Sequence, residues 1–322
     1  MKDNDHKRII QLSVEKRRLL QRLLEEKEKA AETAREAENT EPSARVLDGD
    51  RFTIDPHQLP VDANSIPEQV KAETQQFYDT LNGQLNQTDF SVDARFLNYG
   101  YAPNDRPQHT TVSLPEHTLN KNAIRLILEL VGAFDLTDCA VLDVGCGRGG
   151  TLDTLARYYP VGSLTGLDLS FGAIAFCHTN YAHADFYQGD AENLPFASSS
   201  FDVVTNVESS HNYPNPWRFY AEVQRILRPG GRFLYTDMLP MTNWERTRTQ
   251  LQQLGFIRTH DRDITSNVLL SCDQTAASHQ LIFPAENDAE LMGSFLAVPG
   301  SNMYNAMQNG HSSYRILHLR RD

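Results

Sequence analysis

The stretch Val141-Leu-Asp-Val-Gly-Cys-Gly-Arg-Gly-Gly150 decides the fold of this chain, together with Leu164-Thr-Gly-Leu-Asp168 that follows it. An apolar run that ends in an acid and a glycine turn predicts a buried strand, a tight turn and the start of a helix. The second stretch predicts another strand, which ends at a carboxylate. Glycine lacks a Cβ and accepts positive φ, so Gly145 and Gly147 let the backbone approach a ligand closely. The pattern indicates a site for a nucleoside cofactor.

Two kinds of cofactor fit these glycines. Gly145, Gly147 and Gly150 match the G-x-G-x-x-G pattern of dinucleotide sites, with Asp168 about 20 residues further on as the ribose acid. Asp143 favours S-adenosylmethionine instead, because a carboxylate beside the turn repels a diphosphate and attracts sulfonium and ammonium groups. An alternative for Asp143 is that it only caps the turn through backbone amides.

Further segments continue the alternation of strands and helices. Phe186-Tyr-Gln-Gly-Asp190 and Phe201-Asp-Val-Val-Thr-Asn206 predict strands with polar ends, and Leu227-Arg-Pro-Gly-Gly231 separates a helix from a further strand. This rhythm predicts a mostly parallel sheet with helices on both faces, where ligands bind at the carboxyl ends of the strands. We therefore expect one crevice to collect Asp143, Asp168, Asp190 and Asn206.

Over roughly Leu119 to Asp237, these motifs and their order resemble the class I S-adenosylmethionine-dependent methyltransferases. The resemblance implies an α/β fold with a Rossmann-like, seven-stranded, mostly parallel sheet. It implies that Gly145 and Gly147 line the cofactor and that Asp168 binds the ribose hydroxyls. Asp190, beside the Ala191 amide, would meet the adenine. No Tyr-x-x-x-Lys pair, which short-chain dehydrogenases use as a proton relay, occurs in the chain.

Two tyrosines upstream are also candidates for the cofactor site. Phe96-Leu-Asn-Tyr-Gly-Tyr101 resembles a segment that closes over the cofactor in related methyltransferases, and aromatic rings pack favourably on a sulfonium. Ordinary lid packing is the alternative for both rings. The full set of expected cofactor-binding residues is Asp143, Gly145, Gly147, Asp168, Leu169, Asp190, Ala191, Asn206, Tyr99 and Tyr101.

The segment Asn206-Val-Glu-Ser-Ser-His-Asn-Tyr-Pro214 is the candidate for the chemistry, because it follows a strand end where the transferred methyl group should lie. An alcohol acceptor must lose a proton, and histidine is the usual base near neutral pH. Glu208 precedes His211 by three residues, so the two share a face if a helix starts here. A carboxylate on one imidazole nitrogen would fix the tautomer. We predict a catalytic dyad of His211 and Glu208; a loop histidine and a helix-start acid are the alternatives.

The same segment is similar to the corresponding stretch of the O-methyltransferases of polyketide synthases and of the phthiotriol methyltransferases. This resemblance implies methylation of a hydroxyl on a polyketide or lipid-like intermediate, either free or bound to a carrier protein. Methylation at carbon or nitrogen of another small molecule, as in the sterol and quinone relatives, is one alternative. A cofactor-binding scaffold without turnover is the other.

We expect three parts in the chain. We expect residues 1–45 to form a helical extension. The segment resembles linker segments of polyketide and nonribosomal peptide synthases, which implies a docking role. A solvated helix or a coiled coil is the alternative. Residues 46–118 predict a linker and lid helices. Residues 119–322 predict the methyltransferase core, with a helical lid at about 265–310. An amphipathic helix is expected from Leu114 to Val131.

Composition excludes several classes of function. The net charge of -12 argues against a nucleic-acid partner, which needs clustered Lys and Arg. No apolar run reaches the length of a membrane span, and no signal peptide begins the chain, so we expect a cytoplasmic location. The four cysteines have no C-x-x-C spacing, and we expect no metal site.

Overall fold

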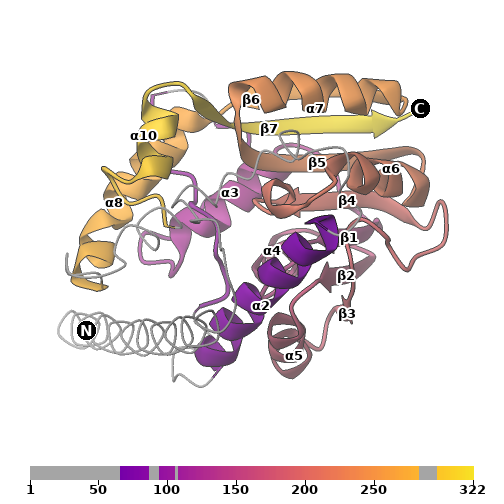
Figure 1. Ribbon diagram of the computed structural model, residues 1–322, viewed down its shortest axis with the longest axis horizontal. Helices are drawn as coiled ribbons and strands as arrows, with labels where there is room; N and C mark the ends of the chain where they lie inside the picture. Colours follow the sequence, from indigo (N-terminus) through magenta and orange to yellow (C-terminus); the bar gives the residue numbers. More distant parts are fainter. Residues whose placement is uncertain (1–65, 87–93, 106–107, 283–295) are drawn as a thin grey trace, which may run out of the picture.

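The computed structural model describes residues 66–86, 94–105, 108–282 and 296–322. These residues form a central sheet with helices on both sides, and helices separate most consecutive strands from β1 onward (Figure 1). The strands are β1 (Ala140–Val144), β2 (Ser163–Asp168), β3 (Asp185–Gln188), β4 (Phe201–Val207), β5 (Leu227–Pro240), β6 (Phe256–Asp263) and β7 (Ser312–Arg321).

The sheet has seven strands in the order β3-β2-β1-β4-β5-β7-β6. The pairs from β3 to β5 are parallel, while β7 runs antiparallel to both β5 and β6. The order of the strands reverses between β1 and β4, and such a reversal opens a crevice at the carboxyl ends of the strands. The predicted seven-stranded, mostly parallel sheet is confirmed.

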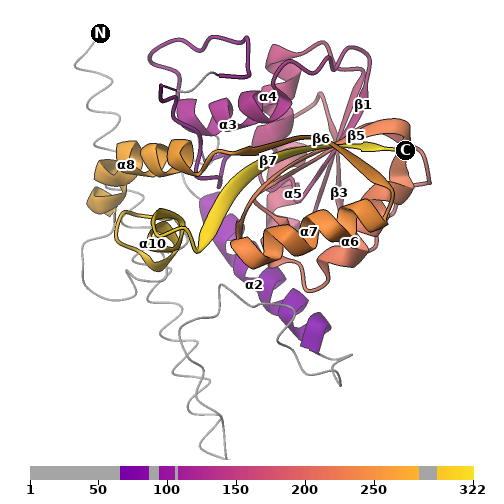
Figure 2. The ribbon, with the colours of Figure 1, turned by 90° about the horizontal axis from the view of Figure 1, so that it is seen from above.

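Side chains of each strand alternate between two apolar layers. Val141 of β1 packs in the layer formed with α3 (Lys121–Val131), α4 (Gly150–Tyr158) and α5 (Phe171–Asn180), whereas Leu142 packs in the opposite layer. That opposite layer is formed with α6 (Pro216–Ile226) and α7 (Met241–Gln253). Figure 2 shows α3 and α4 on one side of the sheet and α6 and α7 on the other.

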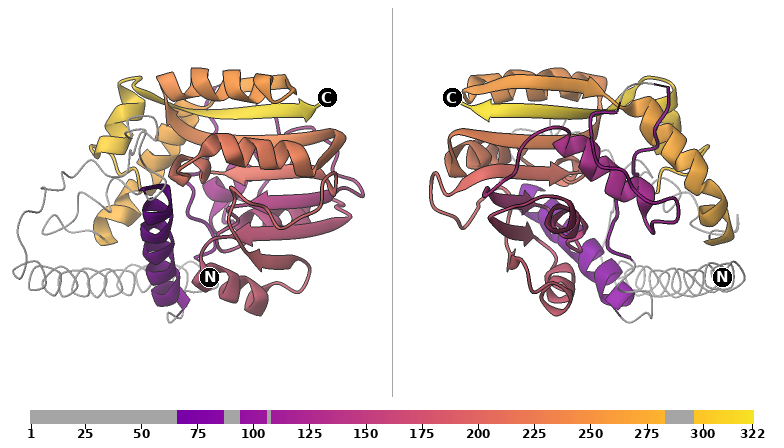
Figure 3. Two further views of the ribbon diagram at one scale, coloured as in Figure 1. Left: turned by 45° about the vertical axis from the view of Figure 1, so that its right-hand side comes forward. Right: turned by 180° about the vertical axis from the view of Figure 1, so that it is seen from behind.

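Three further helices lie at the end of the molecule where the parallel strands finish. They are α2 (Ile66–Asn86), α8 (Thr265–Ile282) and α10 (Asn302–Gln308). The antiparallel β7 points away from them, so they cover the carboxyl ends of β1 to β5 (Figures 1 and 3). Helices in this position enclose the crevice that the strand order creates.

The helix expected from Leu114 begins later than the apolar pattern indicated. Asn120 has a left-handed backbone, with φ 56°, and α3 starts only at Lys121. Leu119, expected in the apolar stripe, is 55% exposed. The docking helix expected in residues 1–45 lies outside the described residues. Within the described part of the chain, no helix is both long and apolar enough to cross a membrane.

Candidate active site

The turn after β1 carries two glycines that the site requires. Gly145 has φ +71°, and a Cβ there would lie 2.0 Å from Oγ of Ser209. The absence of a side chain at Gly145 therefore lets the loop after β4 pack against the turn. Gly147 has φ +50° and lines a pocket, and a Cβ there would meet no atom within 4 Å, so it would face open space. Both glycines line that pocket, so the turn forms one wall of a cradle for a ligand.

Asp168 ends β2 beside this turn. Its carboxylate accepts the backbone N–H of Gly147 at 2.8 Å and that of Ser170 at 2.8 Å. Burial raises the pKa of Asp168, although these two amide hydrogen bonds act in the opposite direction. Asp168 and the adjacent Leu169 line the pocket, so the two amides fix the carboxylate at the pocket wall.

The loop after β3 supplies the next part of the wall, through Asp190 and Ala191. Lys71 of α2 donates to Oδ2 of Asp190 at 2.8 Å and to Oε2 of Glu192 at 3.3 Å. The ion pairs hold α2 over this end of the pocket, which Tyr78 of the same helix also lines. The sequence did not indicate Lys71 or Tyr78, because contacts between α2 and these loops span more than 100 residues.

Three of the expected cofactor residues do not line the pocket. Asp143 lies behind the glycine turn, where it accepts the hydroxyl of Thr205 at 2.6 Å, and burial raises its pKa to about 7. Asn206 is buried too; its amide nitrogen donates to the carbonyl of Val144 at 2.8 Å and to the hydroxyl of Tyr213 at 3.2 Å. Both residues therefore support the turn and the loop from behind.

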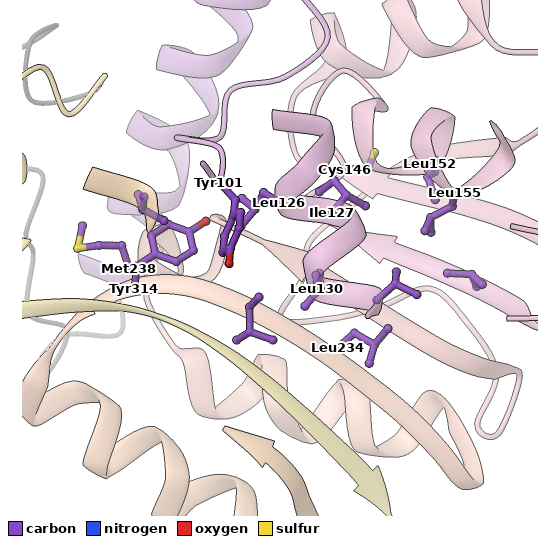
Figure 4. Packing of buried hydrophobic residues seen from close by; sticks show 14 of the residues in the cluster. Tyr101, Leu126, Ile127, Leu130, Cys146, Leu152, Leu155, Leu234, Met238 and Tyr314 are labelled. Atoms are coloured by element: carbon purple, nitrogen blue, oxygen red, sulfur yellow. The ribbon is translucent and has the colours of Figure 1, made fainter. Parts of the chain in front are cut away.

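Tyr101 is the third. It is 1% exposed and packs in the apolar layer near Leu126 and Tyr314 (Figure 4). In an extended strand Tyr99 and Tyr101 would lie on the same side, but Gly100 between them has φ +75°, which breaks that alternation and turns the two rings apart. Tyr99 does line the pocket, whereas Tyr101 points into the core.

His211 lies in a short 3-10 helix, Ser210–Asn212, directly after the loop that follows β4. Its Nδ1 atom is 2.7 Å from Oδ1 of Asp237, and its backbone N–H donates to Oδ2 at 3.1 Å. Asp237 is fully buried in β5 and also accepts the hydroxyl of Ser210 at 2.7 Å. Burial lowers the pKa of His211, but the charge and hydrogen bond of Asp237, aided by the charge of Glu208, raise it above its ordinary value.

Glu208 is not the hydrogen-bond partner of His211, so that part of the predicted dyad is wrong. The prediction assumed a helix, but Glu208 has a left-handed backbone with φ +47° and lies outside the 3-10 helix. Its carboxylate instead accepts the backbone N–H of Tyr99 at 2.9 Å and the hydroxyl of Tyr314 at 2.5 Å. Burial raises the pKa of Glu208 to about 7 against the effect of these hydrogen bonds.

A single pocket contains both groups of residues. Gly145, Gly147 and Asp168 line it on one side, and Glu208 and His211 line it on the other. The sequence-based prediction missed Asp237 because this residue lies on a different strand from His211. Functional residues often lie at the ends of parallel strands, and Asp237 directly follows the last residue of β5 that pairs with β4. That rule would have indicated it. A cradle beside a fixed carboxylate fits an adenosine moiety, and the pair of His211 and Asp237 adjoins it.

Comparison with known proteins identifies the family. A methyltransferase domain model matches residues 142–235. Phthiotriol/phenolphthiotriol dimycocerosates methyltransferase 1 of Mycobacterium ulcerans is 34% identical over 229 residues, which cover 70% of this chain and 83% of that protein. The chain belongs to the S-adenosylmethionine-dependent methyltransferases and uses S-adenosylmethionine as its cofactor.

The fatty-acid O-methyltransferase of Mycolicibacterium smegmatis is 46% identical over 159 residues. That match covers 48% of this chain, and the chain spans only 57% of the length of that relative.

Solved structures share the fold at low sequence identity. The cyclase SpnF has a TM-score of 0.61 at 21% identity, over 78% of this chain and 96% of that structure. The StiE O-MT structure has a TM-score of 0.56 at 22% identity, and the match covers 79% of this chain and 90% of that structure. Geranyl diphosphate C-methyltransferase of Streptomyces coelicolor, solved with S-adenosyl-L-homocysteine, has a TM-score of 0.55 at 16% identity. That match covers 79% of this chain and 98% of that structure. At these identities the matches show the fold alone.

Proposed function

We propose that this methyltransferase methylates a hydroxyl group of a polyketide or lipid-like molecule, with His211 as the general base. The observation that carries the proposal is the hydrogen bond between Nδ1 of His211 and Asp237, in the pocket that also contains Asp168. Bound S-adenosylmethionine supplies an electrophilic methyl group on a sulfonium. Gly145, Gly147, Asp168, Leu169, Asp190, Ala191 and Tyr99 line the space for this cofactor.

The protein then has to remove one proton from the acceptor. When Nδ1–H of His211 donates to Asp237, the lone pair on Nε2 is available to take the hydroxyl proton as the oxygen attacks the methyl group. The carboxylate of Asp237 orients the ring and stabilises the imidazolium that forms. General-base assistance of this kind contributes roughly 10²- to 10⁴-fold to the rate. Glu208 adds negative charge near the ring and holds Tyr99 at the pocket wall.

The charges around His211 favour a neutral hydroxyl over a carboxylate acceptor. A carboxylate needs no base and is best bound by a fixed cation. The basic residues that line the pocket within the described chain are occupied elsewhere: Lys71 pairs with Asp190, Arg95 with Asp153, and Arg148 donates to Asn86. Glu208 and Asp237, in contrast, both lie close to His211. This supports an alcohol, although one relative is named a fatty-acid O-methyltransferase.

The name of the Mycobacterium ulcerans relative refers to phthiotriol dimycocerosates, and this supports a lipid-like acceptor. The resemblance of residues 1–45 to synthase linkers supports an acceptor carried on a protein partner. Incubation with methyl-labelled cofactor and with matched free and carrier-bound hydroxy-acyl substrates tests both points. Mass spectrometry and NMR of the product identify the methylated atom. Methylation at carbon or nitrogen would overturn the assignment to oxygen.

Replacement of the base tests the mechanism. His211→Ala should lose roughly 10²- to 10⁴-fold in turnover and keep its affinity for S-adenosylmethionine, because His211 acts on the acceptor. His311→Ala, at an exposed position, is the matched control. Full turnover in His211→Ala with intact cofactor binding would overturn the proposed base.

A further inference from the structure

The side-chain amide of Asn212 contacts the nitrogen of His211 that Asp237 leaves available. Nδ2 of Asn212 is 3.0 Å from Nε2 of His211 and 3.3 Å from the hydroxyl oxygen of Tyr78. An amide nitrogen can only donate hydrogen bonds, and it has two hydrogens to donate. Asn212 can therefore donate to His211 and to Tyr78 at once, and Nε2 of His211 must then carry a lone pair.

Neither Asn212 nor Tyr78 has a role in the function proposed above. We propose that Asn212, held by Tyr78 of α2, is a positioning residue that keeps His211 neutral, with the lone pair on Nε2, until the acceptor hydroxyl takes the place of the amide. The inference rests on the proposed function, because it assumes that His211 is the base. It assigns α2 a contact with the reaction centre in addition to its contacts with the cofactor loops.

The physical need for such a residue follows from the charges around the ring. Asp237 from β5 and Glu208 from the end of β4 both favour the imidazolium form of His211. Tyr314 of β7 donates to Glu208, and Asp168 of β2 faces Tyr78. An imidazolium has no lone pair and cannot act as a base. A hydrogen bond donated to Nε2 is possible only in the neutral form, so the Asn212 amide opposes the two carboxylates.

The arrangement also explains how the base is released. The acceptor O–H and the Asn212 N–H both donate to the same lone pair, so they compete for one place. When the acceptor displaces the amide, Tyr78 still accepts one of its hydrogens, and the amide remains satisfied beside the substrate. The other hydrogen leaves a contact that is exposed, so the exchange creates no buried donor without a partner, which would cost about 1–3 kcal/mol.

NMR titration of His211 without an acceptor tests the inference directly, since it needs no turnover. In Asn212→Ala the pKa of His211 should rise by about 0.5–1 pH units, because the lost hydrogen bond stabilised only the neutral ring. Asn212→Asp should raise it further, because a carboxylate stabilises the imidazolium. Asn212→Gln, which keeps the donor, should restore part of the wild-type value. Asn305→Ala, on the exposed side of α10, is the control and should change nothing.

Tyr78→Phe separates the two residues. It should raise the pKa of His211 by less than Asn212→Ala does, and it should have no further effect when Asn212 is already alanine, because Tyr78 acts through the amide. Nitrogen chemical shifts of His211 should report the Nδ1–H tautomer for the neutral ring both in the wild type and in Asn212→Ala, because Asp237 still accepts from Nδ1. An unchanged pKa of His211 in both Asn212→Ala and Asn212→Asp would overturn the inference.

The pH profile of kcat/KM distinguishes this inference from the proposed function. If both are correct, the profile of Asn212→Ala moves to higher pH by the shift that NMR measures, and its rate approaches that of the wild type at the alkaline plateau. A shift seen by NMR without a shift in the rate profile would overturn His211 as the base, and with it the role of Asn212 in the reaction. No NMR shift, with His211→Ala inactive, would overturn the role of Asn212 alone.

Discussion

The Oδ1 atom of Asp237 lies 2.7 Å from Nδ1 of His211, although 25 residues separate them in the sequence and they belong to different strands and loops. Asp237 is fully buried, and the backbone N–H groups of His211 and Met238 also donate to its carboxylate. A carboxylate fixed by this many donors cannot turn away from the ring. The orientation of His211 is therefore set by β5, the strand that pairs with β4, and not by the segment that carries the histidine.

Asp237→Asn should be the most damaging substitution of a residue that does not touch the substrate. The amide cannot stabilise an imidazolium, and it lets the ring adopt the wrong tautomer, so kcat should fall roughly 10²- to 10⁴-fold. Loss of the negative charge should also lower the pKa of His211 and move the pH profile to lower pH. Steady-state kinetics over a range of pH measures both effects, and calorimetric titration with cofactor checks that the cofactor still binds. Asp185→Asn, at an exposed position of β3, is the control. Undiminished kcat in Asp237→Asn would contradict the assignment.

The wild-type pH profile should distinguish a hydroxyl acceptor from a carboxylate. The pKa of His211 lies above its ordinary value of 6.5, so the fraction of neutral base falls as the pH is lowered through that raised pKa. With a hydroxyl acceptor, kcat/KM should therefore rise with pH to a plateau. A carboxylate acceptor would bind to the imidazolium, and its kcat/KM would fall over the same interval. Measurement with a matched alcohol and fatty acid gives the answer, and a falling profile for the alcohol would contradict the base.

Glu208→Gln should retain far more activity than Asp237→Asn. A glutamine oxygen can still accept from Tyr99 and Tyr314, so the pocket wall is preserved, while the pKa of His211 falls because one negative charge is lost. Equal losses of kcat in the two variants would show that Glu208 supports the base as directly as Asp237 does.

Glu208→Gln should also change the stability of the protein with pH. The pKa of Glu208 rises from 4.5 to about 7 on folding, so its contribution to stability is complete below pH 4.5 and is lost as the pH rises through 7. Glutamine avoids this loss. Because Glu208 is partly exposed, we expect the variant to be more stable than the wild type by about 1–2 kcal/mol at pH 8 and no more stable at pH 4. Denaturant unfolding at both pH values measures the difference, and Glu245→Gln, in α7, is the control.

The strand, glycine turn and strand around Gly145 and Asp168 could be predicted because each depends on residues close together in sequence. The hydrogen bonds of Glu208 to Tyr99 and Tyr314 could not be predicted in this way. A spacing of three residues places Glu208 beside His211 only in a helix, and the left-handed backbone of Glu208 prevents a helix there. Asp237 reaches the site from the neighbouring strand β5. Lys71 reaches it from a helix that lies more than 100 residues away in the sequence. Their contacts depend on strand register and helix packing, which local patterns do not contain.

Gly147 offers a test of the cofactor site with an unusually close control. Gly147 has φ +50° and Gly230 has φ +79°, and a Cβ at either position would meet no atom within 4 Å. Alanine should therefore strain the backbone similarly at both, at a cost of roughly 1–2 kcal/mol in stability. Only Gly147 lines the pocket, so only Gly147→Ala places a methyl group in the space for the cofactor. We expect its affinity for S-adenosylmethionine to fall at least about tenfold, or 1.4 kcal/mol, while Gly230→Ala binds like the wild type. Thermal unfolding and calorimetric titration of both variants separate strain from occlusion. Equal cofactor affinity in the two would contradict the placement of the cofactor against this turn, because backbone strain is the one effect that they share.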